Sequence, residues 1–350
     1  MAELKDRFLL SRNLDKIENK KVLVRVDLNV TIVKGRVLDQ GRLAVVKNII
    51  KVLRPAKQII LVSHYGRPTK PTQKYSLKQL VPFLKPGQFR FSQWPKQPLK
   101  PEAKYILLEN LRFLKEEEEN DSGFARSLSR IADVYINEAF SVSHRSHASV
   151  IGVAKLLPSF FGLQFEKEIE NLNKVFKQKT GLGIVIGGAK IETKLPLIEN
   201  FLAQADLVVL AGKISQGYLK NQKLSSSFNL LRPTGPVRNP KLLLPIDGSA
   251  FDIGPKSVAL FIEKLKPMKL IVWNGPLGKI EDKRFETGTK LFAPALAQMK
   301  NFRIVGGGDT LDLIYKYKLQ KQFNFISTGG GAMLKYLAQG NLVGLQAIQR

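Results

Sequence analysis

The chain has 350 residues, and lysine and arginine outnumber the acidic residues enough to give a formal net charge of +27. It contains no cysteine, which excludes disulfide bonds, thiol catalysis and thiolate metal sites. The length predicts about two domains. A charged N-terminal stretch and the lack of any apolar run of about 20 residues predict a cytoplasmic protein without a membrane span.

Short apolar runs alternate with helical patterns along the chain, which predicts βαβ units around parallel sheets. The apolar runs are continuous and rich in leucine or β-branched residues, as in strands covered on both faces. We expect strands at residues 22–26, 59–62, 106–108, 134–136, 183–186, 207–210, 270–272, 302–305 and 325–327. We expect helices at residues 43–53, 124–131 and 193–202.

The two halves of this pattern are expected to form separate domains. The boundary is placed near Leu157 and Pro158, so that residues 1–157 form the first domain and residues 181–333 the second. Residues 158–180 would connect them through one charged amphipathic helix at residues 163–178.

Two charged stretches of the first half have competing interpretations. Residues 85–104 are basic and include Phe89, Phe91 and Trp94, a mixture that can bind single-stranded nucleic acid. A surface connection broken by prolines, with a few core aromatics, is the favoured interpretation of this stretch. The acidic run at residues 116–119 is predicted to be a solvated helix start.

Three glycine clusters, at residues 187–188, 306–308 and 329–331, follow predicted strands of the second half. Glycine lets backbone amides approach a phosphate, and a following helix adds a favourable dipole. Ligands of open α/β sheets bind at such strand ends. No GxxxxGK[ST] signature occurs, and no GxGxxG follows the first strand, so neither a P-loop nor a dinucleotide site is indicated. The clusters therefore predict another kind of phosphate site.

Charged residues accompany these strand ends. Lys190 and Lys194 are four residues apart at a helix start and so share one face. Asp309 ends the GGGD run, where it could hold Mg²⁺ or cap the next helix. In the first half, polar residues follow strands or turns: Asp27, Asn29, Arg42, Arg67, Arg112 and Arg145. Each arginine could bind a carboxylate or phosphate, or form a surface ion pair.

At this point the motifs resemble those of phosphoglycerate kinases. VRVDLNV (24–30), SHYGRP (63–68), ENLRF (109–113), ADVYINEAF (132–140) and HRSHAS (144–149) are similar to the N-terminal domain of that family. IGGAK (186–190), DIGPK (252–256), VWNGPLG (272–278), GGGDT (306–310) and STGGGA (327–332) are similar to its nucleotide domain. The motif order and approximate spacing agree from about residue 20 onward.

The resemblance implies two Rossmann-like α/β lobes with parallel sheets, joined by an interdomain helix. Residues 334–350 would return to the glycerate-binding N-terminal domain. The implied activity is reversible, Mg²⁺-dependent phosphoryl transfer from 1,3-bisphosphoglycerate to ADP, a step of glycolysis and gluconeogenesis, by a monomer. The competing hypothesis is a nucleic-acid-binding protein on a kinase-like scaffold, suggested by the charge of +27.

The resemblance also implies roles for individual residues. The residues that match glycerate-binding positions are Asp27, Asn29, Arg42, His64, Arg67, Arg112 and Arg145. Those that match nucleotide-binding positions are Gly187, Ala189, Lys190, Lys194, Gly212, Asn274, Pro276, Glu281, Gly307, Gly308, Asp309 and Thr310. Glu281 would hold the ribose hydroxyls and Asp309 the magnesium ion. The implied catalytic group consists of Arg42, Lys194, Gly308 and Gly330.

The chain departs from the family pattern around the expected adenine pocket. The usual GGG after the second strand of the nucleotide lobe reads Leu210, Ala211 and Gly212, and a usual glycine is Ala250. The choice between ATP and GTP is therefore left open. The stretch between Leu219 and Asp247 is shorter than usual, and Thr31 replaces a common proline.

Overall fold

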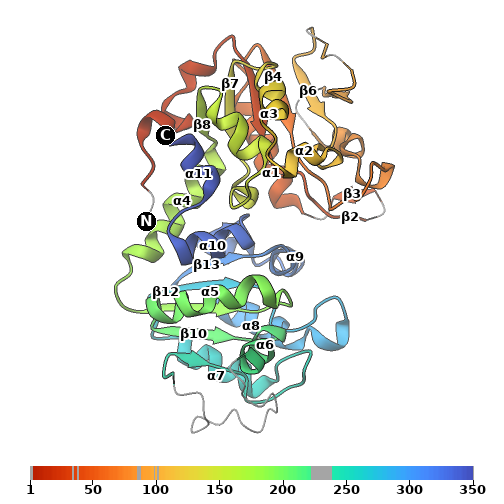
Figure 1. Ribbon diagram of the computed structural model, residues 1–350. Helices are drawn as coiled ribbons and strands as arrows, with labels where there is room; N and C mark the ends of the chain where they lie inside the picture. The colour runs from red at the N-terminus through yellow and green to blue at the C-terminus, as the bar shows by residue number, and fades with distance from the viewer. Residues whose placement is uncertain are drawn as a thin grey trace. The chain divides into compact units, whose positions relative to one another are not determined.

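The computed structural model describes residues 3–33, 35–37, 39–84, 88–97, 99–100, 102–221 and 239–349. Parts of the basic stretch, at 85–87, 98 and 101, and residues 222–238 of the shortened stretch lie outside them. The chain forms two compact units, Met1–Glu170 with Asn341–Arg350, and Asn171–Gly340 (Figure 1). Among the described helices, none combines the length and the apolar character needed to cross a bilayer.

Unit 1 is built on a six-stranded sheet in the order β5-β6-β4-β1-β7-β8, and every pair in it is parallel. The four predicted strands are confirmed, and β5 and β8 are additional. A two-stranded antiparallel hairpin, β2 and β3, lies outside the sheet. The strands are β1 (Lys21–Arg25), β2 (Ile32–Val33), β3 (Arg36–Val37), β4 (Gln58–Val62), β5 (Arg90–Ser92), β6 (Tyr105–Leu108), β7 (Val134–Asn137) and β8 (Ser159–Phe161).

Short helices surround this sheet. Helix α1 begins three residues before the predicted start, because Asp39 caps it by accepting a hydrogen bond from Arg42 N at 2.9 Å. The helices are α1 (Gln40–Val52), α2 (Lys115–Glu118), α3 (Ser122–Ser129), α4 (Leu163–Lys177) and α11 (Val343–Ile348). The shorter turns are η1 (Asp6–Phe8), η2 (Leu10–Arg12), η3 (Leu14–Ile17), η4 (Gln73–Tyr75), η5 (Leu77–Phe83), η6 (Leu111–Phe113), η7 (Phe140–Val142), η8 (Ala148–Gly152) and η9 (Val153–Lys155).

The core of unit 1 lies between the sheet and α1. Leu43, Val46 and Ile49 of that helix are buried against strand side chains such as Val24 and Leu61. The apolar residues of α1 recur at helical spacing, so one stripe of the helix faces the sheet. Burying one such side chain is worth about 1.5–3 kcal/mol.

Unit 2 is built on a second parallel six-stranded sheet, in the order β11-β10-β9-β12-β13-β14. The five predicted strands are confirmed, and the two-residue β11 is additional. The strands are β9 (Leu182–Ile186), β10 (Leu207–Leu210), β11 (Leu242–Leu243), β12 (Leu270–Asn274), β13 (Phe302–Gly306) and β14 (Phe325–Ser327). The helices are α5 (Ile191–Gln204), α6 (Lys213–Asn221), α7 (Pro255–Leu265), α8 (Thr287–Ala297), α9 (Gly308–Lys316) and α10 (Gly331–Gln339), with turns η11 (Lys283–Phe285) and η12 (Gln320–Gln322).

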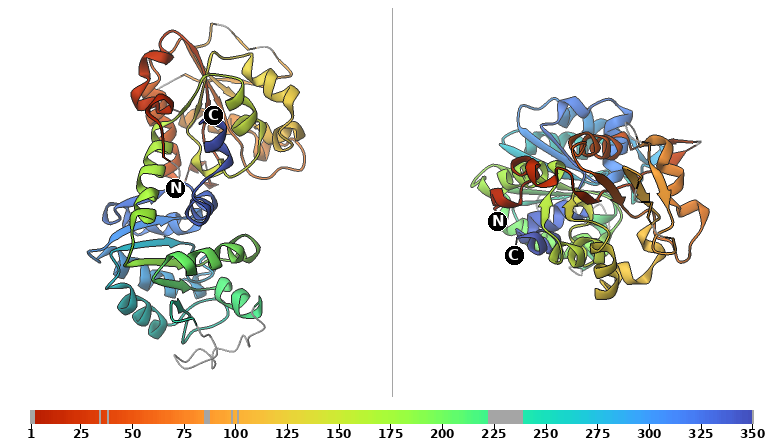
Figure 2. Two further views of the ribbon diagram at one scale, coloured as in Figure 1. Left: turned by 60° about the vertical axis from the view of Figure 1, so that its left-hand side comes forward. Right: turned by 90° about the horizontal axis from the view of Figure 1, so that it is seen from above.

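Helices cover both faces of the second sheet (Figures 1 and 2). Helices α7, α8 and α9 share one core with it, centred on Trp273, whose ring meets that of Phe292 edge to face at 5.2 Å. On the other face α5 packs against α6 and α10. This double coverage explains why the strands read as continuous apolar runs.

The topology of each sheet marks where a ligand can bind. After β1 the chain moves to β4 on one side and returns to β7 on the other; after β9 it moves to β10 and returns to β12. The connections on the two sides diverge and leave a crevice at the carboxyl ends of these neighbouring strands. The fold therefore places one candidate site in each unit, beyond β1 and β7 and beyond β9 and β12.

The chain passes from unit 1 to unit 2 within α4, which matches the helix predicted at residues 163–178. Helix α11 returns to unit 1, where Gly344 N donates to the Ser143 carbonyl at 2.9 Å. A Cβ on Gly344 would lie 2.8 Å from Val150 Cγ1, so the contact needs glycine. The limits predicted at residues 157, 180 and 333 remain a prediction.

Candidate functional site

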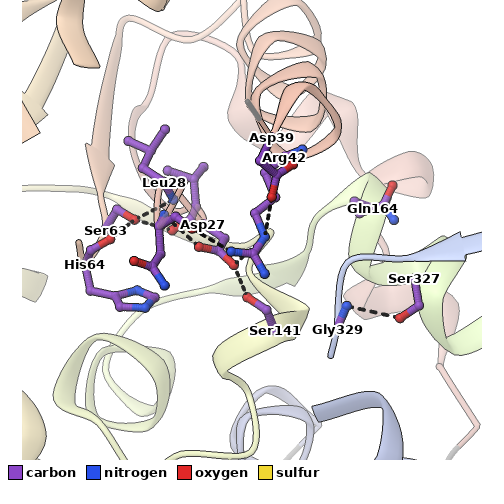
Figure 3. Close-up of polar contacts among 12 residues, drawn as sticks. Asp27, Leu28, Asp39, Arg42, Ser63, His64, Ser141, Gln164, Ser327 and Gly329 are labelled. Atoms are coloured by element: carbon purple, nitrogen blue, oxygen red, sulfur yellow. Dashed lines mark hydrogen bonds and ion pairs between the residues drawn. The ribbon is translucent and has the colours of Figure 1, made fainter. Parts of the chain in front are cut away.

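The site of unit 1 begins with Asp27, which follows β1. Its carboxylate lies 3.4 Å from Arg42 Nε and accepts a hydrogen bond from Ser141 Oγ at 2.5 Å (Figure 3). Ser141 follows β7, so this contact joins the segments that follow β1 and β7 at the switch point of the sheet. Burial raises the pKa of the Asp27 carboxyl, but Arg42 and the Ser141 hydroxyl outweigh it and lower the pKa to about 2. Asp27 is ionised at neutral pH.

Asn29 holds two further parts of the site. Its carbonyl accepts from Arg42 Nη1 at 2.6 Å, and its side-chain Oδ1 accepts from Gly66 N at 2.8 Å. Gly66 has a φ of +65°, a conformation that favours glycine, and its carbonyl accepts from Arg112 Nη1 at 2.6 Å. The loops after β1, β4 and β6 are thus joined around Gly66.

Arg67, Arg112 and Arg145 of unit 1 interact electrostatically. Burial and the nearby Arg145 lower the pKa of Arg112 to about 10, and burial and Arg67 lower the pKa of Arg145. Arg67 is exposed, whereas Arg112 is buried with Glu118 3.1 Å from its Nε. Guanidinium groups that lower one another's pKa repel one another, so a bound anion would relieve the repulsion.

The charges of Arg112 and Arg145 also act on His64. It is buried, and its Nδ1 is 3.2 Å from Arg25 Nη2. Burial and the Arg25 guanidinium lower the pKa of His64 well below its ordinary value, so the imidazole is neutral near pH 7.

One interpretation of unit 1 is confirmed only in part: the acidic run begins α2, and Glu116, Glu118 and Glu119 are exposed. The acidic run at residues 116–119 is not wholly solvated, because Glu117 is 0% exposed and accepts hydrogen bonds from Ser149. Sequence reasoning also missed Arg25, Ser141 and Ser149 as parts of the site. Arg25 lies in a buried strand, where a charged side chain needs buried partners, and that was the available signal.

The site of unit 2 is formed by glycine turns beyond β9 and β12. Gly187 N donates to the Asn274 carbonyl at 2.9 Å, and Gly188 N donates to the Pro276 carbonyl at 2.7 Å. A Cβ on Gly187 would lie 2.1 Å from the Pro276 carbonyl oxygen, and Gly275 has a φ of +96°. The two turns approach each other as closely as glycine allows.

Lys194 lies over these turns. Its ammonium donates to the Gly187 carbonyl at 2.6 Å. Burial and Lys190 lower the pKa of Lys194 to about 8, with Asp309 acting in the opposite direction. Lys190 and Asp309, the other two charged residues expected at the phosphates, therefore both act electrostatically on Lys194. Lys190 itself is exposed at the N-cap of α5.

The third glycine cluster leads into α9, whose N-cap is Gly307 with a φ of +102°. Asp309 lies in the first turn of α9 and does not cap it, so the capping interpretation is wrong. Thr310 is buried, and its Oγ1 accepts from Gly275 N at 3.0 Å. This contact ties the start of α9 to the turn after β12.

The remaining predicted nucleotide residues lie around these turns. Asn274 Nδ2 donates to the Gly330 carbonyl at 3.2 Å, and Gly330 precedes α10. A pocket joins Glu281 to Asp309, with Asp312 and Lys316 in its wall. Gly308 has no atom within 4 Å of an added Cβ, so it borders open space. Ala189 is exposed beside these turns.

Gly212 and Ala250, which lie in the two segments that depart from the family pattern around the expected adenine pocket, both have close polar neighbours. Gly212, φ +61°, faces the Leu277 carbonyl, and Gln216 Nε2 donates to the Ala250 carbonyl at 2.8 Å.

In the basic stretch, Phe89 is buried with its ring centroid 5.3 Å from that of Tyr105. Trp94 packs against Phe124 at 5.9 Å. These two rings contact protein, which favours core aromatics over a stacking platform.

Each unit thus brings its own predicted residues together. In unit 1 the contacts join Asp27, Asn29 and Arg42, and electrostatics join the arginines. In unit 2 they join Gly187, Lys194, Asn274, Gly330 and Thr310. The joint action of Arg42 and Lys194 involves both units and remains a prediction.

The chain is similar to proteins of known activity over nearly its whole length. A family model described as "Phosphoglycerate kinase" matches residues 12–235 and 237–340. The phosphoglycerate kinase of Finegoldia magna is 35% identical over 95% of this chain and 97% of the relative. "Phosphoglycerate kinase 3, cytosolic" of Arabidopsis thaliana is 35% identical over 95% and 96%, respectively.

Solved structures of such enzymes share the fold. The phosphoglycerate kinase of Pyrococcus horikoshii OT3 superposes with a TM-score of 0.81 at 26% identity, covering 98% of both chains. That of Coxiella burnetii has a TM-score of 0.74 at 29% identity, covering 95% of this chain and 97% of its own.

Proposed function

Because this chain belongs to the phosphoglycerate kinase family, it is a phosphotransferase with a carboxyl group as acceptor, and we propose that its two sites perform the transfer together. The reaction moves a phosphoryl group between 1,3-bisphosphoglycerate and ADP, giving 3-phosphoglycerate and ATP. We further propose that it acts as a monomer in the cytoplasm, the compartment named for the Arabidopsis relative.

The site of unit 1 is proposed to hold the glycerate ligand. Arg67, Arg112 and Arg145 bind its fixed phosphate, which supplies the anion that relieves their mutual repulsion. Asp27 is ionised and accepts the hydroxyl hydrogen of the ligand. Asn29 orients the reacting end and keeps Arg42 in place.

The site of unit 2 is proposed to hold the nucleotide. The turns at Gly187, Gly307 and Gly330 let backbone amides approach the phosphates, and α9 adds its dipole. Lys194 neutralises the terminal phosphate, and Glu281 binds the ribose hydroxyls at the pocket it shares with Asp309.

The donor set of unit 2 fits Mg²⁺ that arrives with the nucleotide. Mg²⁺ usually takes one or two carboxylates and completes its shell with phosphate oxygens and water. Asp309 is an exposed carboxylate in the first turn of α9, and the described residues contain no group of three or more acidic, histidine or cysteine side chains able to hold a metal alone. When bound, Mg²⁺ neutralises phosphate oxygens of the nucleotide.

The transfer itself requires positioning and charge neutralisation. The attacking carboxylate of 3-phosphoglycerate has an ordinary pKa of about 4, so it is ionised at neutral pH and needs no general base. We propose that Arg42 and Lys194 flank the migrating phosphoryl group while amides of Gly308 and Gly330 stabilise its oxygens. This step requires the two units to close on each other and exclude water.

The observation that supports this proposal most is the pair of switch-point sites, one rich in arginine and one rich in glycine with Lys194. A direct assay with 3-phosphoglycerate and MgATP tests it, with GTP in parallel to settle the base preference. Arg145→Ala is expected to raise KM for 3-phosphoglycerate at least about tenfold, a loss near 1.4 kcal/mol, with kcat within about threefold. An inactive wild-type protein, or an unchanged KM in Arg145→Ala, contradicts the assignment.

A further inference from the structure

A buried charged network lies behind the glycerate site of unit 1, and the mechanism above does not use it. Its members are Arg25 at the end of β1, Glu117 in α2 and Ser149 in η8, and all three are 0% exposed. A buried charge is costly unless it is paired and hydrogen-bonded. The contacts of these side chains therefore explain how two charges are kept inside the unit.

Ser149 connects the two charges. Its hydroxyl donates to Glu117 Oε1 at 2.6 Å and its backbone N–H donates to Oε2 at 2.9 Å, while Arg25 Nε donates to the same hydroxyl at 2.9 Å. The hydroxyl has one hydrogen, which is given to Glu117, so its lone pair is oriented toward Arg25. Consecutive hydrogen bonds of this kind polarise and strengthen one another. His147 Nδ1 lies 3.6 Å from Glu117 Oε1 as a second neighbour.

The other edge of the Arg25 guanidinium faces the glycerate site. Nη1 donates to the Val26 carbonyl at 2.6 Å, and Nη2 contacts His64 Nδ1 at 3.2 Å. Ser63 Oγ, 3.4 Å from Nη1, accepts from Leu28 N at 2.9 Å (Figure 3). Arg25 thus braces the loops after β1 and β4, which carry Asp27, Asn29 and His64.

The same contact selects a tautomer of His64. Arg25 has only donors, so Nδ1 of the neutral imidazole must be the acceptor and Nε2 must carry the hydrogen. If the guanidinium turned away, both the tautomer and the ring orientation of His64 would lose their support.

We propose that Glu117 and Ser149 are positioning residues of the glycerate site, which hold the Arg25 guanidinium so that it fixes His64 and the loop of Asp27. The inference rests on the proposed function, because it assigns glycerate binding to unit 1. It predicts that a carboxylate in α2 controls substrate affinity through a serine hydroxyl and an arginine.

The matched pair Glu117→Gln and Glu116→Gln tests this. Both remove one negative charge from the same run, but Glu116 is exposed. Glu117→Gln is expected to raise KM for 3-phosphoglycerate at least about tenfold, with KM for MgATP within about twofold, and Glu116→Gln is expected to match wild type. An inactive wild-type protein would defeat the proposed function, whereas active wild type with an unchanged KM in Glu117→Gln would overturn this inference alone.

Two further variants separate positioning from folding. Ser149→Ala keeps the backbone N–H that binds Glu117 but removes the bridge to Arg25, so it is expected to raise the same KM in a folded protein. The double variant Glu117→Gln, Arg25→Met removes both buried charges and is expected to recover thermal stability relative to Glu117→Gln without recovering affinity. Recovery of affinity in the double variant, or a normal KM in Ser149→Ala, would overturn the proposal.

A spectroscopic readout does not depend on substrate. The ¹⁵N chemical shifts of the His64 ring report which nitrogen accepts a hydrogen bond. They are expected to change in Glu117→Gln and in Ser149→Ala but not in Glu116→Gln. Identical His64 shifts in all four proteins would show that the network does not act on His64 and would overturn the proposal.

Discussion

The surroundings of Lys194 disfavour its positive charge. Burial and Lys190 lower its pKa to about 8, so the free enzyme loses the ammonium within an accessible pH range. If the charge is needed for the nucleotide phosphates, kcat/KM for MgATP falls about tenfold per pH unit above pH 8, because that ratio reports groups of the free enzyme.

Lys194→Arg is the control for this pH profile. Arginine keeps its proton throughout the range, so the slope above pH 8 is expected to flatten even if the overall rate drops. A wild-type profile that stays level to pH 9.5, or an equally steep profile in Lys194→Arg, would show that the charge of Lys194 is not what the reaction needs.

At this scale the sequence was informative where a residue's chemistry is local. Asp27 and Asn29 could be predicted because they follow a strand at the carboxyl edge of a parallel sheet, and Lys194 because it lies four residues after Lys190 at a helix start. Glu117 could not, since an acidic run normally lies in solvent and only the arrival of Ser149 and Arg25 from distant segments makes its burial favourable.

Helix α4 begins without a capping side chain of its own, because Gly162 precedes it. Instead the Glu138 carboxyl group, which follows β7, accepts from Gln164 N at 3.2 and 3.1 Å. A Cβ on Gly162 would lie 1.9 Å from Glu138 Oε2, so the approach requires glycine. A buried carboxyl group therefore caps the helix through which the chain leaves unit 1.

This cap makes stability depend on pH. Burial raises the pKa of Glu138 from 4.5 to about 8 despite its hydrogen bonds to the helix. Between pH 4.5 and pH 8 the unfolded state releases a proton that the folded state keeps. The contribution of Glu138 to stability is therefore fully present below about pH 4.5 and is lost as the pH rises to about 8. Glu138→Gln cannot ionise, so it is expected to flatten this decrease and to lie within about 1 kcal/mol of wild type at pH 5, where the protonated Glu138 and the glutamine amide can both accept from the helix.

Urea unfolding of wild type and Glu138→Gln at pH 5, 6.5 and 8 measures the difference in their free energy of unfolding. All other titrating groups are the same in the two proteins, so their effects cancel. Glu138→Gln should gain stability relative to wild type as the pH rises. Parallel pH dependences in the two proteins would contradict the assigned pKa.

At the scale of elements, prediction succeeded for long apolar runs and failed for short edge strands. β5 is three residues long and lies among prolines, and β11 is a two-residue edge pairing with β10 alone. Such strands are set by the neighbour that they pair with, which the local sequence does not contain. Asp39 was a local signal for the earlier start of α1 that the apolar pattern alone did not use.

For the whole molecule, the charge of +27 far exceeds the few cations that the two sites use. The described aromatics Phe89 and Trp94 of the basic stretch pack against protein, so they do not support single-strand stacking. A net charge of this size creates a positive field around the protein, which salt screens.

The two-unit architecture was predictable because each half repeats the same strand and helix alternation. What the pattern could not provide is the network behind the site of unit 1, since its partners are far apart in sequence. Arg25 and Ser149, for example, are 124 residues apart. The proposed transfer requires both units to act on one phosphoryl group.

The turnover number of Arg42→Ala, Lys194→Ala and the double variant, with saturating 3-phosphoglycerate and MgATP, tests this most directly. Each single variant is expected to lose about 10²–10³-fold in kcat. The double variant should lose less than the product of the two, because both residues stabilise the same transition state. Near-normal turnover in either single variant, or losses that multiply independently, would contradict a shared phosphoryl group.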